Sequence, residues 1–161
     1  MLPKGEFTVY SILEQPEIVK LSTRLVQNNL LISFYSSIED VPTNFDIVYF
    51  GSSAPYIENF YEILKFLEVS KPTFIIFDRT PIAELPEDIF YVEKPPQEYY
   101  SGSSYPVRIF SRSKFVGLLV NQMGYQLVSE WEERFQPYPR SKSMGYFFKL
   151  RSVRVDEDIS K

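Results

Sequence analysis

Two apolar runs in the middle of the sequence are each followed by side chains that could bind a ligand or move a proton. Gly51 and Ser52 follow the first run, and Asp78, Arg79 and Thr80 follow the second. A carboxylate can act as a base or orient a substrate, and a guanidinium can hold an anionic group. The alternative is an internal ion pair within a turn, because neighbouring Asp and Arg often satisfy each other.

The composition excludes several kinds of chemistry. The 161 residues contain no Cys and no His, which rules out disulfides, thiolate nucleophiles, Ser-His-Asp catalysis and imidazole metal ligands. We expect no metal site, since the acidic pairs lack the ligand spacing of a calcium loop. The net charge of -4 argues against nucleic acid and anionic membranes as partners, and no run is long and apolar enough to span a bilayer. We therefore expect a cytoplasmic protein.

The first half of the chain has the pattern of alternating strands and helices. Strands are predicted over residues 7–13, 30–35, 46–50 and 73–77, and helices over residues 16–26 and 58–69. The last two strands, DIVYF and TFIIF, are almost continuously apolar, which indicates burial on both faces. The second of them is predicted to stop at Asp78.

The second half of the chain departs from this rhythm. The window 82–107 contains four prolines and is predicted to be an excursion rather than another β-α unit. Ser111 is the expected N-cap of a helix that extends to residue 123, with Gly124 as its C-terminal stop. Residues 125–131 and 145–150 then predict an antiparallel pair of strands, and residues 151–161 a flexible tail.

These elements predict an α/β fold, a Rossmann-like, mostly parallel sheet with helices on both faces and a C-terminal antiparallel hairpin. In such sheets ligands bind beyond the carboxyl ends of the strands. Glu14, Ser36, the stretch 51–53 and the stretch 78–80 all follow predicted strands. We therefore expect them to meet at one edge and to form the rim of a binding crevice.

Four segments carry a resemblance to a known family. They are ILEQPEIV at 12–19, FDIVYFGSSAPYIENFYEILKFL at 45–67, PTFIIFDRTP at 72–81 and PPQEYYSGSSYPVRIFSRSKF at 95–115. Together they resemble class I, Rossmann-like methyltransferases that depend on S-adenosylmethionine and are found near bacterial surface-polysaccharide genes. The resemblance assigns residues 1–150 to one methyltransferase-like domain and implies S-adenosylmethionine as the cofactor.

The resemblance also implies roles for residues at the strand ends that would hold the cofactor. Glu14 would accept hydrogen bonds from the ribose hydroxyls, which suits a carboxylate because it can accept from both at once. Ser36 and Ile38 would border the adenine, with Ser36 standing where an acidic residue is common. Gly51 and Ser52 would lie beside the methionine portion.

A second group of residues would face the acceptor by the same resemblance. Asp78 is the candidate base or orienting group, and Arg79, Thr80 and Tyr105 are the candidate substrate-binding residues. The implied acceptor is a small or glycan-like molecule that is methylated on an oxygen or nitrogen atom.

The sequence departs from the family at its start. Class I methyltransferases begin with a strand, a Gly-rich turn and a helix, whereas this chain begins at what matches the second strand, so the domain is expected to be N-terminally truncated. A sheet without this central strand must pair its neighbours directly, borrow a strand from a partner, or belong to a longer protein. Self-association into a homo-oligomer is a further expectation, because the strand edges would be exposed.

Three function classes follow from these observations. The first is a methyltransferase, or the C-terminal part of one, and whether this chain retains the cofactor and the activity is left open by the absent turn. The second is a non-catalytic methyltransferase-like module for binding or assembly, which the absent turn favours. The third, a hydrolase that uses two carboxylates, has only scattered acids in its support.

Overall fold

A computed structural model describes residues 9–26, 31–94, 104–134 and 138–151 of the chain. Of the predicted tail only Arg151 is described, and its N–H donates to the Gly124 carbonyl at 3.1 Å. The rest of the tail and the tyrosines at positions 99 and 100 lie outside the described residues. The chain divides into two units, Met1–Phe45 and Asp46–Lys161, and backbone pairing forms a separate sheet in each unit.

The first unit is a small β-α-β arrangement. Strand β1 (Tyr10–Leu13) leads into helix α1 (Pro16–Leu25), and strand β2 (Ile32–Tyr35) then pairs parallel with β1. The helix starts with Pro16, whose fixed φ suits a first helical turn, and Glu17 follows it where negative charge is favourable. A short 3₁₀ turn, η1 (Ile38–Asp40), follows β2.

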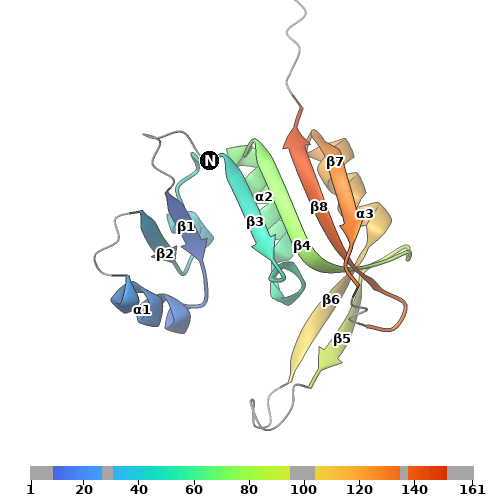
Figure 1. Cartoon of the computed structure of the whole chain (residues 1–161), viewed down its shortest axis with the longest axis horizontal. Helices are drawn as coiled ribbons and strands as arrows, with labels where there is room; N and C mark the ends of the chain where they lie inside the picture. Colours follow the sequence, from blue (N-terminus) through green and yellow to red (C-terminus); the bar gives the residue numbers. More distant parts are fainter. Residues whose placement is uncertain (1–8, 27–30, 95–103, 135–137, 152–161) are drawn as a thin grey trace, which may run out of the picture. The chain divides into compact units, whose positions relative to one another are not determined.

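The second unit contains a six-stranded sheet in which β4 (Phe74–Ala83) is central (Figure 1). Strands β3 (Ile47–Gly51) and β6 (Tyr105–Ser111) pair parallel with β4. Strand β8 (Lys142–Leu150) runs antiparallel on the other side of β4, and β7 (Tyr125–Glu132) pairs with β8. The predicted C-terminal antiparallel hairpin is therefore confirmed.

The window of prolines is an excursion, as predicted, but it contains regular structure. Strand β5 (Ile89–Glu93) pairs antiparallel with β6, and the two strands form an arm at one end of the sheet (Figure 1). Between these two strands the structure describes residues 94 and 104, and neither belongs to a helix or a strand. The sequence pattern did not predict the strand at 89–93.

The core of the second unit lies between the sheet and its helices. Helices α2 (Phe60–Ser70) and α3 (Arg112–Gly117) pack on the same face, because the ring centroids of Phe60 and Phe115 are 6.1 Å apart and both rings contact Phe77 of β4. All of these rings are fully buried. The 3₁₀ turn η2 (Ala54–Tyr56) precedes α2, and one turn of π-helix, η3 (Leu118–Gln122), continues α3.

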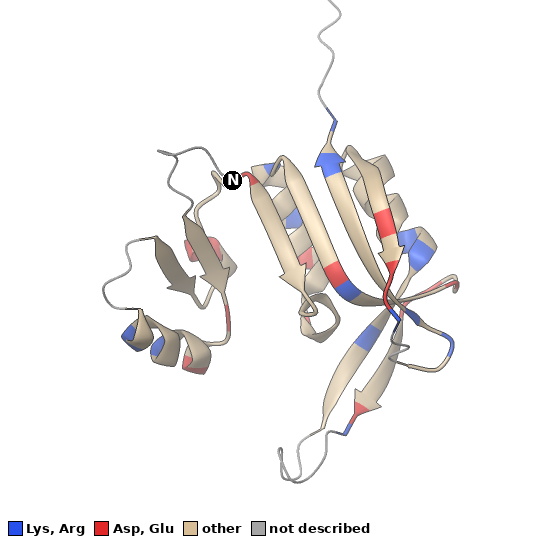
Figure 2. Ribbon diagram, in the orientation of Figure 1, with Lys and Arg blue, Asp and Glu red and all other residues tan. Residues whose placement is uncertain are grey.

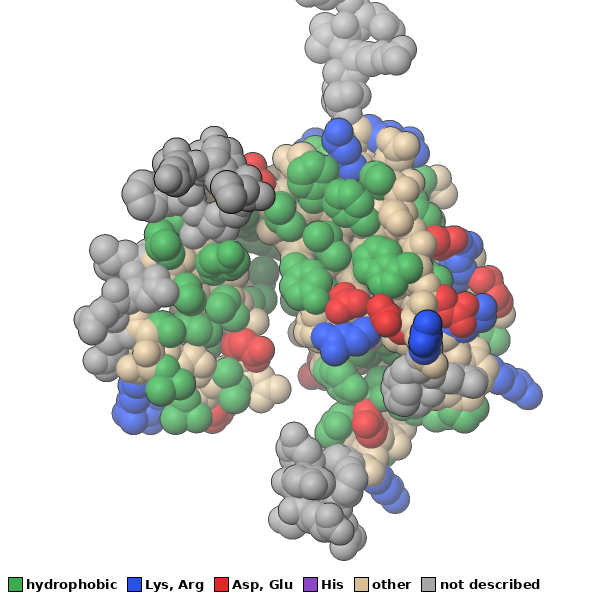
Figure 3. Space-filling model, viewed as in Figure 1, with side chains coloured by type: hydrophobic (Ala, Val, Ile, Leu, Met, Phe, Trp, Pro, Cys, Tyr) green, Lys and Arg blue, Asp and Glu red, His purple; other side chains and the backbone are tan. Residues whose placement is uncertain are grey.

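The opposite face of this sheet is apolar and partly open to solvent. Ile47 and Tyr49 of β3 are 56% and 58% exposed, and their partners in β4 lie beside Phe147 of β8. The space-filling view shows this apolar area over the middle of the sheet, bordered by charged side chains (Figure 3). The described helices of the second unit all pack on the other face.

The predicted α/β, Rossmann-like class is confirmed by this arrangement. Strands that precede the hairpin, apart from β5, pair parallel with one another, and the antiparallel pairings belong to β5 and the hairpin. The prediction that this strand stops at Asp78 was wrong, because β4 continues through Asp78 to Ala83.

Candidate functional site

The strand β4 contains an irregularity at the residues that the sequence singled out. Pairing with β8 shifts register between Phe77 and Thr80, and Arg79 has a left-handed backbone with φ of 51°. Asp78 and Arg79 therefore form a β-bulge, a feature that bends a strand and redirects its side chains. Adjacent red and blue bands mark the bulge on the β4 ribbon in Figure 2. The strand continues past Asp78 and Arg79 because the bulge leaves these two residues out of the pairing with β8, which resumes at Thr80.

The Asp78 carboxylate is already held by two donors. Its Oδ2 accepts a hydrogen bond from the Tyr49 hydroxyl at 3.1 Å and another from the Arg79 Nε at 3.1 Å. The predicted alternative of an internal ion pair is therefore present in the structure. Burial, together with the bond to Asp78, raises the pKa of the Tyr49 hydroxyl, so this group remains a donor.

Gly51 provides room for the tyrosine of this cluster. A Cβ at position 51 would lie 2.8 Å from Cε1 of Tyr49, which is closer than real Cβ contacts allow. The space that the missing side chain leaves is thus taken by the Tyr49 ring.

Ser52 turns the chain out of the sheet immediately afterwards. Its φ of 59° is left-handed, and its N–H donates to the backbone oxygen of Asp78 at 3.0 Å. A non-glycine residue in this conformation carries backbone strain, which is often found where a site is built. The turn leads directly into η2.

A cavity of about 370 Å³ lies at these strand ends. Ser52 and Arg79 line it together with Pro55, Tyr56 and Pro81, and Glu93, Glu133, Tyr138 and Ser143 contribute the rest of its wall. The volume is within the range of small-molecule sites, and the lining combines apolar surfaces with convergent polar groups. This cavity is the candidate functional site of the second unit.

Glu93 is the centre of a hydrogen-bond network on the cavity wall. Its Oε2 accepts from the Tyr138 hydroxyl at 2.7 Å and from the Tyr56 hydroxyl at 3.4 Å. Burial raises the pKa of both tyrosines, so their hydroxyls stay protonated and continue to donate. The Tyr138 ring also stacks on Tyr91, with centroids 5.8 Å apart, which fixes its position.

The structure brings most of the predicted residues of the second unit together. Ser52 and Arg79 line the cavity, and Gly51 is the register partner of Asp78. The Tyr105 ring packs edge-on against the Tyr56 ring, which is part of the wall, with centroids 5.6 Å apart.

Thr80 differs from these neighbours because it is fully buried. Its Oγ1 is among the buried polar atoms that have no hydrogen-bond partner within the described part of the chain. A threonine without access to solvent does not contact a ligand in the cavity as the structure stands. Thr80 marks the end of the bulge, because pairing with β8 resumes there opposite Met144.

The other three predicted residues lie in the first unit. The Glu14 N–H donates to the Tyr35 carbonyl at 2.9 Å, so Glu14 and Ser36 end neighbouring parallel strands, as predicted. Both side chains are exposed, and Ile38 begins η1 in a half-buried position. The Glu14 Oε2 accepts a hydrogen bond from the Gln15 N–H at 3.2 Å.

Sequence reasoning missed Glu93, Tyr56, Tyr138 and Glu133. Glu93 is in the proline-rich window, and Glu133 belongs to an acidic pair that was considered only as a metal ligand. Glu133 lines the cavity, and its Oε1 accepts from the Trp131 indole N–H at 3.1 Å. Glu93 ends β5 and Tyr56 ends η2, whereas Glu133 and Tyr138 lie in the connection between β7 and β8, so no single local spacing relates the four residues. Only the position of Tyr56, three residues after the Gly-Ser-Ser turn, was a usable signal.

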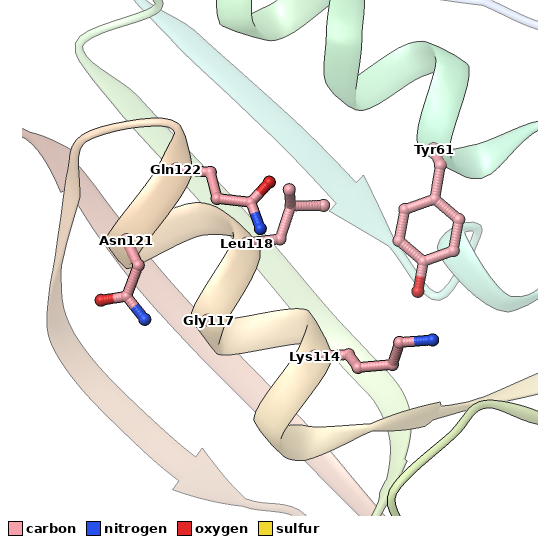
Figure 4. Close-up of a pocket in the computed structure, with 6 residues that line it drawn as sticks. All are labelled: Tyr61, Lys114, Gly117, Leu118, Asn121 and Gln122. Carbon is pink, nitrogen blue, oxygen red and sulfur yellow. The ribbon is translucent and has the colours of Figure 1, made fainter.

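A second cavity, of about 430 Å³, lies between α2 and the α3–η3 segment (Figure 4). Tyr61 and Lys114 point into it from opposite sides in this view. Both groups have partners: the Tyr61 hydroxyl donates to Asp88 at 2.6 Å, and Lys114 forms an ion pair with Glu87. Asp88 also accepts from the Ser111 N–H at 2.9 Å, so this network anchors the chain before β5 to α2 and α3.

The described residues contain neither a metal-binding cluster nor a membrane-spanning helix. No group of three or more acidic, His or Cys side chains among them could hold a metal ion. None of their helices has the length and apolarity needed to cross a membrane.

Comparisons with known proteins give a fold likeness. No family model matches the sequence, and no curated protein is significantly similar to it. Among solved structures, the glycopeptide N-methyltransferase MtfA in complex with S-adenosyl-L-methionine matches 88% of this chain and 72% of its own length, with a TM-score of 0.60 and 10% identity.

A second solved structure gives the same result. A SAM-dependent methyltransferase from Methanosarcina mazei matches 89% of this chain and 84% of its own length, with a TM-score of 0.59 and 12% identity. Another crystal structure of MtfA matches with a TM-score of 0.56 and 9% identity. The chain therefore has the fold of these methyltransferases.

Proposed function

We propose that this chain is part or all of a methyltransferase that takes its methyl group from S-adenosylmethionine. The observation that carries the proposal is the cluster of Ser52, Asp78 and Arg79, where the carboxyl end of β3 meets the bulge of β4, with Ser52 and Arg79 lining a cavity of ligand size. This is the edge at which open α/β sheets bind ligands. The fold likeness to two SAM-dependent methyltransferases supports this function.

The resemblance supplies the residues that would hold the cofactor. Glu14 would accept hydrogen bonds from the ribose hydroxyls, and Ser36 and Ile38 would border the adenine. The backbone of Gly51 and the side chain of Ser52 would lie beside the methionine portion. When bound, the cofactor supplies a methyl group on a positively charged sulfur, which is an activated leaving group.

The remaining task of the chain is to align the acceptor with that methyl group. Asp78 would orient the acceptor or take its proton through Oδ1, because Oδ2 accepts from Tyr49 and Arg79. Arg79 and Tyr105 would contact the acceptor, and Thr80 would support the bulge that positions Arg79. The glycopeptide substrate of MtfA favours a glycan-like acceptor methylated on oxygen or nitrogen.

Calorimetric titration with S-adenosylhomocysteine tests the proposal. We expect the wild-type chain to bind, and Glu14→Ala to weaken binding about tenfold or more, because a charge-assisted hydrogen bond is lost. Glu17→Ala is the matched control, since Glu17 is an exposed carboxylate on the first turn of α1. Equal losses in the two variants would contradict the role of Glu14.

Absence of binding by the wild-type chain would contradict the proposed activity. It would favour the alternative, a non-catalytic methyltransferase-like module for binding or assembly. A cytoplasmic location and self-association remain predictions within this proposal. Self-association is supported by the exposed Ile47 and Tyr49 on strand β3, which pairs with β4 alone in the described sheet, and sedimentation at several concentrations would measure it.

A further inference from the structure

The charges of the cavity in the second unit favour a cation. Glu93 and Glu133 both line it, whereas Arg79 is the one basic residue among the described residues that do. The positive charge of Arg79 is partly neutralised, because its Nε donates to the carboxylate of Asp78 at 3.1 Å. An anionic ligand would meet an excess of negative charge here, and a cationic ligand would relieve it.

The aromatic groups of the wall point to the same class of ligand. The hydroxyls of Tyr56 and Tyr138 both donate to Oε2 of the Glu93 carboxylate. Their rings belong to the lining of the cavity, together with the apolar ring of Pro55. Aromatic faces and a carboxylate are the groups that proteins combine to bind ammonium ions.

The network also fixes the carboxylate in place. Two tyrosine hydroxyls hold one oxygen, which leaves Oε1 of Glu93 for a ligand. Burial keeps both hydroxyls protonated, so they do not add negative charge that would repel the carboxylate. Glu93 is therefore oriented before a ligand binds, which lowers the entropic cost of binding.

We propose that this cavity binds the cationic amino group of a small molecule, with Glu93 as its anchor and the rings of Tyr56 and Tyr138 beside it. Glu133 adds a second carboxylate to the same site. Within the proposed function this molecule is the acceptor, so the substrate class would be small amines, amino sugars among them. Because an ammonium nitrogen has no free electron pair, either another oxygen or nitrogen atom of the molecule would take the methyl group, or the nitrogen would first give its proton to a carboxylate of the cavity. The binding step itself does not require the cofactor.

Nuclear magnetic resonance titration of the full chain, with labelled tyrosines, tests the inference. The probes are two matched pairs: cyclohexylamine against cyclohexanol, and glucosamine against glucose. We expect the amines to shift the Tyr56 and Tyr138 signals in a saturable manner, and the neutral partners to bind about tenfold more weakly or not at all.

Glu93→Gln separates charge from shape. Its amide oxygen can still accept from the two tyrosines, so the wall is kept, but we expect amine affinity to fall about tenfold and alcohol affinity to stay unchanged. Glu68→Gln is the matched control, because Glu68 is an exposed carboxylate on α2 outside the cavity. If Glu93→Gln changes the amide spectrum of the fold, Glu133→Gln serves in its place with the same expectation.

Three results would overturn the inference: equal binding of amine and alcohol, equal effects of the Glu93 and Glu68 variants, or shifts confined to residues away from the cavity. These outcomes are distinguishable from failure of the proposed function. A chain that binds amines but not S-adenosylhomocysteine would keep the amine site and contradict the methyltransferase. A chain that binds S-adenosylhomocysteine but not amines would support the methyltransferase and contradict the amine site.

Discussion

At the scale of single residues, Trp131 and Gly145 depend on each other. A Cβ at position 145 would lie 2.0–2.3 Å from three atoms of the Trp131 indole, so the ring packs directly on the glycine of the neighbouring strand. The indole N–H also donates to Glu133, which lines the candidate site. This contact therefore connects a packing feature of β7 and β8 to a carboxylate of the cavity.

We predict that Gly145→Ala displaces this indole. The ring would lose its packing surface and its hydrogen bond, so tryptophan emission should shift to longer wavelength and the free energy of unfolding should fall by about 1 kcal/mol. Trp131 is the single tryptophan of the chain, so its fluorescence reports this site alone. Gly117→Ala is the control, because its nearest new contact, at 3.7 Å, is an ordinary one. Unchanged emission would contradict the predicted displacement.

Tyr125 gives the protein a predictable loss of stability in alkali. Its buried hydroxyl donates to the Pro72 carbonyl at 2.8 Å, and burial raises its pKa from 10.0 to about 12. The stabilising contribution is complete below pH 10.0, where the phenol is protonated in both states. It is lost between about 10 and about 12, because the unfolded chain ionises first and is thereby favoured.

Urea unfolding at increasing pH measures this effect. Tyr146, which is also buried and whose pKa is raised to about 12, should add to the decline in the same range. Tyr125→Phe should cost about 1 kcal/mol at neutral pH, since the Pro72 carbonyl loses its donor, and should make the alkaline decline shallower. Tyr10→Phe, at an exposed position, serves as the comparison. Parallel pH profiles for wild type and Tyr125→Phe would refute the assignment.

At the scale of elements, the helix after β6 shows what local signals can predict. Ser111 was the predicted N-cap, and its Oγ accepts from the Lys114 N–H at 3.4 Å. Gly124 was the predicted stop, and its φ of 79° is left-handed. The π-turn at η3 was not predicted, since no residue type requires that the Met123 N–H donate to the Leu118 carbonyl.

Alanine substitutions at Gly117, inside this segment, and at Gly124, just after it, should change the free energy of unfolding in opposite directions. Gly117 has helical φ and ψ of -60° and -40°, so Gly117→Ala should stabilise the protein by roughly 0.5–1 kcal/mol through lower backbone entropy in the unfolded chain. Gly124→Ala should destabilise it by about 1 kcal/mol, because alanine is strained at positive φ. Denaturant midpoints measure both changes. A stabilising Gly124→Ala would contradict the left-handed assignment.

The elements that sequence reasoning missed share a physical cause. The strand beginning with TFIIF was predicted to stop at Asp78 because polar residues replace the apolar run there. A bulge keeps the ladder intact across Asp78 and Arg79, and apolar alternation does not encode a bulge. The wall residue Glu93 was missed for a similar reason, since its tyrosine partners are 37 and 45 residues away along the chain. Long-range pairings of this kind arise from the tertiary fold.

At the scale of the whole molecule, the two units differ in how much they bury. Every fully buried side chain in the described residues belongs to the second unit, from Phe50 onward. The apolar side chains of α1 are exposed instead, with Leu21 at 58% and Leu25 at 85%. The strands of the first unit were predicted from the sequence, but this lack of burial was not, because periodicity shows which face is apolar and not what covers it.

The burial difference predicts unequal hydrogen exchange. Amides of residues 10–35 should exchange at least about a hundredfold faster than those of β4 and β8, because a unit without a closed core opens locally at little cost. Exchange measured by mass spectrometry, with and without S-adenosylhomocysteine, then tests the cofactor assignment as well. If Glu14 and Ser36 hold the ribose and adenine, the ligand should slow exchange in residues 10–35 and not only around Ser52. If the ligand slowed exchange in the second unit alone, Glu14 and Ser36 would not hold the cofactor. If exchange were slow in both units without ligand, the prediction that the first unit has a weak core would be contradicted.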